Sequence, residues 1–107
     1  MKVKIENTTI VHHVKPYDDG IVLVGFVNGV VEYDRLLKDN LKIVYGKNVK
    51  HIIKFPENIE AISISYIEGL LEGLTHEYYK GELMESISFE GNYKVVNKVE
   101  KVFYNIM

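Results

Sequence analysis

Five segments of the chain carry the pattern of hydrophobic and polar positions that is typical of β-strands. Polar and apolar residues alternate over 2–6, and apolar, largely β-branched runs occupy 10–15, 21–27, 49–55 and 86–89. The pair Asp19-Gly20, between the second and third runs, is a strong hairpin signal. Because the third run is apolar on both faces, we expect it to lie inside the sheet.

Three other segments have apolar residues at helical spacing. After a turn at Asn28-Gly29, the first spans residues 34 to about 45. The second spans residues 65 to about 80, with Gly81 as its stop. The third follows a turn at Gly91-Asn92, and its expected buried face is Val95, Val96, Val99, Val102, Phe103 and Ile106.

The element order is therefore strand, strand, strand, helix, strand, helix, strand, helix. It predicts one α/β domain over residues 1–107, with α+β as the alternative. We expect a mixed sheet of about five strands packed against three helices.

Composition narrows the classes of function. Apolar residues make up 47% of the chain and charged residues 26%, which is usual for a soluble globular protein. A net charge of −2 argues against nucleic-acid binding through a basic face. Without cysteine there is neither a disulfide framework nor a thiolate nucleophile. No apolar run is long enough to cross a membrane and the start lacks a signal-peptide pattern, so we expect a cytoplasmic protein.

The join between the strand 49–55 and the helix after it holds the main functional clue. Ser65 and Glu68 have the spacing of a capping box, which predicts that the helix begins at Ser65. A serine there serves either as a cap or as a regulatory switch, and the sequence leaves both roles open. Gly69 and Gly73, four residues apart in the same helix, favour close packing on a neighbouring element over a flat docking surface.

This join and the element order resemble a STAS domain, in particular the short STAS-like domains found near histidine-kinase-type ATPases. The residues that carry the resemblance run from Phe55-Pro56 through Ile62-Ser63-Ile64-Ser65-Tyr66 to Leu71. In anti-sigma-factor antagonists of this family, a serine of an aspartate-serine-serine-glycine motif at the helix start is phosphorylated. Here Ser63 stands at the aspartate position, Ile64 at the first serine, Ser65 at the second and Tyr66 at the glycine.

The resemblance implies a non-enzymatic regulatory module that binds another protein, such as a histidine-kinase-like ATPase. We expect the contact or switch region to consist of Ser63, Ser65, Tyr66, Glu68, Gly69 and Glu72. The alternative is a small phage or mobile-element inhibitor that binds a host or defence enzyme, for example an anti-CRISPR-type inhibitor. A homodimer with a structural role is a third hypothesis.

The sequence does not favour catalysis, a cofactor or a metal site. A set such as Ser65, His51 and Asp34 lacks the glycine-flanked nucleophile elbow that would support it. His12 and His13 are adjacent on a strand, so they point to opposite faces and cannot share one ion. We expect the four histidines to be surface or half-buried side chains, and we expect neither a cofactor nor a metal.

Overall fold

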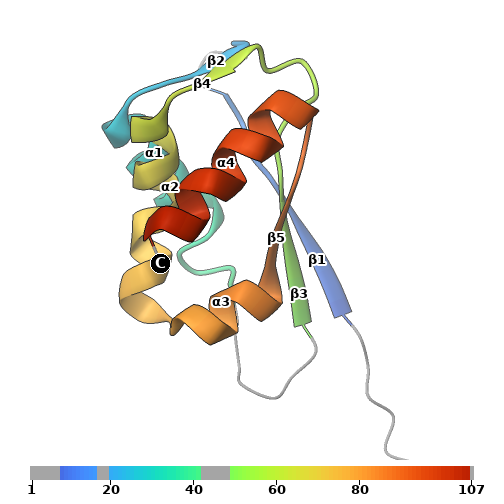
Figure 1. The fold of residues 1–107 in the computed structure, drawn as a ribbon, viewed down its shortest axis with the longest axis vertical. Coiled ribbons are helices and arrows are strands. Elements are labelled where there is room, and N and C mark those ends of the chain that lie inside the picture. The colour runs from blue at the N-terminus through green and yellow to red at the C-terminus, as the bar shows by residue number, and fades with distance from the viewer. Residues whose placement is uncertain (1–7, 17–19, 42–48, 107) are drawn as a thin grey trace, which may run out of the picture.

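The computed structural model describes residues 8–16, 20–41 and 49–106, which form four helices and five strands. In chain order these are β1 (Thr8–His13), β2 (Val22–Leu23), α1 (Phe26–Leu36), β3 (Val49–Lys54), β4 (Ala61–Ile62), α2 (Ile64–Glu77), α3 (Lys80–Ser86), β5 (Ile87–Glu90) and α4 (Tyr93–Ile106). The α/β fold class is therefore confirmed (Figure 1). The expected mixed sheet with three helices is wrong in detail, because the described strands pair only in parallel, in two sheets, and a fourth helix is present.

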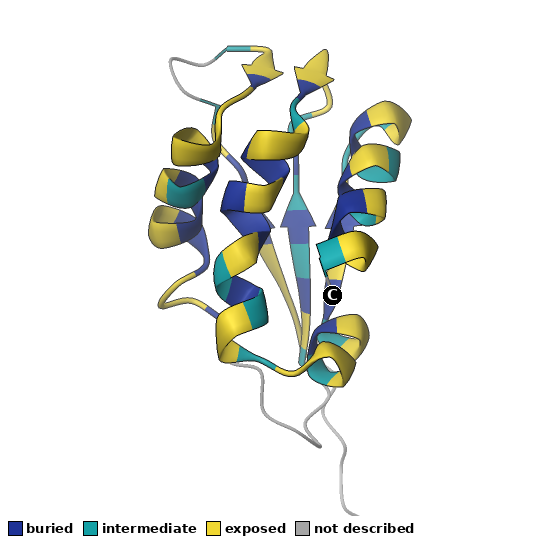
Figure 2. Cartoon of the chain, turned by 60° about the vertical axis from the view of Figure 1, so that its left-hand side comes forward, coloured by how far each residue is buried: buried dark blue, intermediate teal, exposed yellow. Residues whose placement is uncertain are grey.

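The larger sheet contains three parallel strands in the order β1-β3-β5. Ile10 of β1 is paired with His51 of β3, and His51 is paired with Ile87 of β5. In the central strand His51 and Ile53 are fully buried, whereas Lys50, which precedes them, is exposed and Ile52, which lies between them, is half-buried. The helices lie on one side of this sheet (Figure 2). The alternation of more buried and less buried side chains along β3 therefore reflects one face covered by helices and one uncovered face.

A second, two-stranded parallel sheet lies at one end of the molecule. Val22 of β2 is paired with Ala61 of β4. Each of these short strands continues almost directly into a helix, β2 into α1 and β4 into α2. The N-terminal ends of the two helices therefore lie side by side at the same end of the fold (Figure 1).

Helices α1 and α2 pack closely because each has a glycine at the crossing. A Cβ atom built on Gly29 would overlap the carbonyl oxygen of Tyr66, and one built on Gly69 would overlap that of Phe26. One turn further on, a Cβ atom on Gly73 would meet the ring of Tyr33. The predicted packing role of Gly69 and Gly73 is confirmed, and the neighbouring element is α1.

The last helix has the expected amphipathic face. Val95, Val99, Val102 and Phe103 are buried, and Phe103 packs edge-on against Phe89 of β5 with ring centroids 5.2 Å apart. Asn92 caps this helix, since its side-chain oxygen accepts a hydrogen bond from the Val95 N–H at 3.0 Å.

Three expectations about the N-terminal half are wrong. The run 21–27 is not an internal strand, because only Val22–Leu23 pair and a helix begins at Phe26. Gly25, at φ 92°, ends the extended backbone, and Gly29 lies inside α1 instead of in a turn. The expected hairpin is absent among the described residues, where β1 pairs with β3 and β2 with β4, both in parallel.

Two further boundaries differ. Helix α2 ends at Glu77, and Gly81 lies within a fourth helix, α3, instead of stopping α2. Helix α1 ends at Leu36, so the helix expected over 34–45 corresponds only to its last residues. The expected strand 2–6 and the segment 42–45 lie outside the described residues.

Candidate functional site

The two helix N-termini are joined by hydrogen bonds through Ser63. The N–H of Ser63 donates to the carbonyl oxygen of Leu23 at 2.8 Å, and the Gly25 N–H donates to the Ser63 hydroxyl at 3.3 Å. These bonds hold the start of α1 against the start of α2. The end of the fold that contains Ser63 and Ser65 is thus built from two strand–helix units, β2 with α1 and β4 with α2.

Ser63, and not Ser65, caps helix α2. Its hydroxyl accepts a hydrogen bond from the Tyr66 N–H at 3.0 Å, and the helix begins at Ile64. The predicted capping box at Ser65 and Glu68 is wrong by two residues, because Ser65 already lies in the first helical turn. Ser65 is exposed, whereas Ser63 is half-buried and its hydroxyl is engaged.

The expected contact residues divide between the surface and the interior. Ser65, Glu68 and Glu72 are exposed and follow one outer face of α2. Tyr66 and Gly69 are buried against α1 and are not available to a docking protein in this arrangement.

Several exposed apolar side chains lie at the end of the fold that carries Ser65. Val27 is 71% exposed and Ile64 is 53% exposed, and Val24 and Phe26 are each nearly half exposed. Ile64 follows Ser63 directly, and Ser63 is bonded to Gly25, so the backbone segments that carry these side chains lie next to each other. We name Val24, Phe26, Val27, Ile64 and Ser65 the mouth surface.

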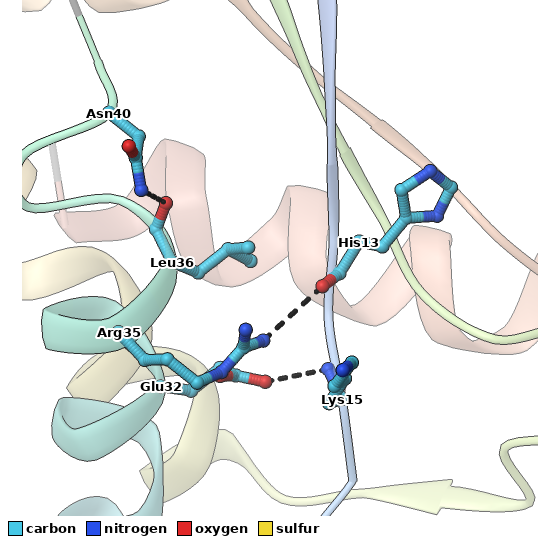
Figure 3. Close-up of polar contacts among 6 residues, drawn as sticks. All are labelled: His13, Lys15, Glu32, Arg35, Leu36 and Asn40. Atoms are coloured by element: carbon cyan, nitrogen blue, oxygen red, sulfur yellow. Dashed lines mark hydrogen bonds and ion pairs between the residues drawn. The ribbon is translucent and has the colours of Figure 1, made fainter.

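A pocket of about 430 Å³ lies beside the mouth surface, between α1, β2 and the residues after β1. Glu32, which is only 5% exposed, is its most buried charged residue. One carboxylate oxygen of Glu32 accepts a hydrogen bond from the Lys15 N–H at 2.6 Å, and the other accepts from Nε of Arg35 (Figure 3). The Arg35 Nη2 also donates to the carbonyl oxygen of His13 at 3.3 Å.

Tyr66 completes the pocket wall from α2. Within the described part of the chain its hydroxyl is buried with no hydrogen-bond partner. Burial, and then the charge of Glu32, raise the pKa of Tyr66 well above its ordinary value, so the hydroxyl stays protonated at neutral pH.

This pocket was not predicted from the sequence. Glu32 lies before the first helix expected from the sequence, which starts at residue 34, so the spacing of Glu32 and Arg35 did not indicate a pair on one helical face. On a helix, a glutamate three residues before the single arginine, Arg35, is a recognisable ion pair.

A buried histidine pair lies in the main sheet. His12 is 6% exposed and His51 fully buried, so the expectation of surface or half-buried histidines is wrong for these two. Their rings are stacked, and a hydrogen bond of 2.9 Å joins Nε2 of His12 and Nδ1 of His51. Burial, and then the proximity of His51, lower the pKa of His12. His12 and His13 point to opposite faces, as predicted.

The described residues contain no group of three or more histidine, aspartate or glutamate side chains arranged to hold a metal ion. None of the helices in the described ranges is both long and apolar enough to cross a membrane. Comparisons of the chain with protein-family models, with curated proteins and with solved structures found no match.

Proposed function

We propose that this protein is a non-enzymatic regulatory module that binds another protein through the mouth surface. The observation that carries the proposal is that four apolar side chains, Val24, Phe26, Val27 and Ile64, are exposed at the end of the fold that carries the exposed Ser65. Single exposed apolar residues are common, but several of them at one end of a small domain favour a contact region.

The partner that we propose is a histidine-kinase-like ATPase, on the basis of the STAS resemblance. Its contact face should be apolar and should carry lysine or arginine at the rim, because Glu68 and Glu72 extend from the mouth surface along α2. Charges of this kind at a rim govern the rate and salt dependence of association more than the affinity.

Ser65 is the residue that we propose as the switch. It is exposed in the first turn of α2, whereas the Ser63 hydroxyl already accepts two backbone hydrogen bonds. A negative charge at Ser65 would be tolerated by the helix N-terminus but would oppose burial of Ile64 and Val27 in an apolar contact.

Photo-crosslinking in the native host tests this proposal. The crosslinking residue p-benzoylphenylalanine is placed at Val27 in the mouth surface, or at the exposed Tyr104 of α4 as a matched control. Position 27 should give one discrete crosslinked protein, position 104 should not, and Ser65→Glu should reduce the yield at position 27. Mass spectrometry then identifies the partner.

Two outcomes would contradict the proposal. Equal crosslinking from positions 27 and 104 would mean that the mouth surface is not the contact region. A crosslinked nuclease or other defence enzyme, unaffected by Ser65→Glu, would favour the inhibitor hypothesis over the ATPase partner.

A further inference from the structure

The pocket beside the mouth surface combines charged and apolar walls. Lys15, Glu32 and Arg35 supply two positive charges and one negative charge. The apolar part of the wall comes mainly from valines, which are Val22, Val24 and Val31. A volume of about 430 Å³ falls in the range of small-molecule sites.

Glu32 fixes Arg35 and leaves part of the guanidinium for a ligand. Both carboxylate oxygens of Glu32 are occupied, one by the Lys15 N–H and one by Nε of Arg35. The Nη groups of Arg35 carry four N–H donors, of which one is directed at the His13 carbonyl oxygen. The remaining donors form one end of a planar fork that matches a carboxylate.

The Tyr66 hydroxyl is a second and independent indication of a ligand. Its side chain is 3% exposed, lines the pocket, and among the described residues has no hydrogen-bond partner for its hydroxyl. A buried hydroxyl without a partner is unfavourable, and a ligand oxygen would supply the missing one. Glu32, Arg35 and Tyr66 line the same pocket, and the charges of Glu32 and Arg35 both influence the pKa of this hydroxyl.

We propose that this pocket binds a small organic monocarboxylate with a short apolar chain. The ligand carboxylate accepts hydrogen bonds from the Nη end of Arg35 and from the Tyr66 hydroxyl, and Lys15 adds a second positive charge. The apolar chain lies along Val22, Val24 and Val31.

Charge and shape select this class of ligand. Two cations and one carboxylate leave a net charge of one positive unit, which a monoanion neutralises and a phosphate dianion would exceed. The valine side chains have no hydrogen-bond donors for a sugar or a second anionic group, but they provide apolar surface for methylene groups. The one uncharged amide side chain in the lining, Asn28, already donates from Nδ2 to the carbonyl oxygen of Val24 at 2.9 Å. Binding at this pocket does not depend on the proposed protein partner.

Nuclear magnetic resonance titration of the isotope-labelled chain with hexanoate tests the proposal, and 1-hexanol and hexylammonium serve as matched probes. Hexanoate should move the backbone amide signals of Lys15, Glu32 and Arg35, with a Kd on the order of 1 mM for a ligand of this size. The alcohol and the amine should bind at least about tenfold more weakly, because they lack the carboxylate that Arg35 pairs with.

Variants locate the binding. Arg35→Gln should weaken hexanoate binding by about tenfold or more, since a hydrogen bond between charged groups is lost. Lys15→Gln keeps the backbone N–H that bonds to Glu32 and should weaken binding by about threefold, whereas Lys38→Gln, beyond the end of α1, should have no effect. Unchanged amide signals of the main sheet would establish that each variant is folded.

Three results would overturn the proposal. They are the absence of shifts at these amides with about 50 mM hexanoate, equal binding of 1-hexanol, and equal weakening by Lys15→Gln and Lys38→Gln. The second would indicate an apolar crevice without recognition of the carboxylate, and the third a general effect of net charge.

Discussion

The close contact between α1 and α2 predicts that a single methyl group added at Gly29 destabilises the fold. In Gly29→Ala, the new Cβ atom would overlap the carbonyl oxygen of Tyr66 and lie 2.8 Å from the backbone nitrogen of Leu70. Both neighbours are backbone atoms in the first two turns of α2, so no side-chain rotation relieves the overlap. The two helices must move apart, and the fully buried Leu70 and Ile67 lose packing.

Two opposing contributions determine how much Gly29→Ala changes the free energy of unfolding. Alanine in place of glycine in a helix interior contributes about 1 kcal/mol of stability. Overpacking that displaces backbone costs about 1–3 kcal/mol and sometimes more, and the overlap with two backbone atoms belongs at the upper end. We expect Gly29→Ala to lower the free energy of unfolding by about 2 kcal/mol, which in a domain of this size corresponds to a decrease in Tm of roughly 10 °C.

Urea denaturation followed by circular dichroism measures this difference, and Gly81→Ala provides the matched control. Gly81 lies in helix α3, where a new Cβ atom would have nothing within 4 Å. Gly81→Ala should therefore raise the free energy of unfolding by about 0.5–1 kcal/mol. If Gly29→Ala stabilised the protein as much as Gly81→Ala, the close crossing of α1 and α2 would be refuted.

Three further predictions concern other parts of the fold. Ser63→Ala should lower the free energy of unfolding by about 1 kcal/mol and Ser65→Ala by less than about 0.5 kcal/mol, because only Ser63 caps α2. If urea denaturation showed the larger loss for Ser65→Ala, Ser65 would be the cap, as the capping-box pattern predicted. Since the pKa of His12 lies below its ordinary 6.5, the unfolded chain binds more protons below that pH, so stability is complete above pH 6.5 and falls as pH decreases through the lowered pKa. His12→Asn should flatten this slope in Tm measurements, and an unchanged slope would exclude His12 as its source. Tyr66→Phe should raise the free energy of unfolding by about 1 kcal/mol by removing an unpaired hydroxyl, whereas a loss of stability would mean that the hydroxyl has a partner.

The parts of the fold that were predicted correctly are those in which one face is buried and the pattern has a single period. Strand β3 and helix α4 are examples, because alternate residues of β3 and every third or fourth residue of α4 meet the core. Their ends agree with the sequence to within one or two residues.

The start of α1 could not be predicted because its exposed face is also apolar. Val27 and Val31 are exposed, so the segment lacks the polar side that distinguishes an amphipathic helix from an internal strand. The same exposed valines contribute to the mouth surface and to the pocket wall, and a functional surface is where such local rules are expected to fail.

The start of helix α2 was predicted to within two residues, but its surroundings were not predicted. The sequence located the helix mouth at residues 63–65, but it could not reveal that α1 starts beside it, because strand pairing between distant segments is not encoded in a local pattern. The pocket formed by Glu32, Arg35 and Tyr66 depends on that same pairing.

The parallel sheet also determines when the fold can be completed. Each of its pairings joins segments separated by a third or more of the chain, and β5, at one side of β3, precedes only the final helix. Loop closure must therefore precede most of the stabilising contacts, and folding should be slower than that of a helical bundle of similar length. During synthesis, β1 and β3 can pair before β5 has left the ribosome, and until then the second edge of β3 stays open to misassembly.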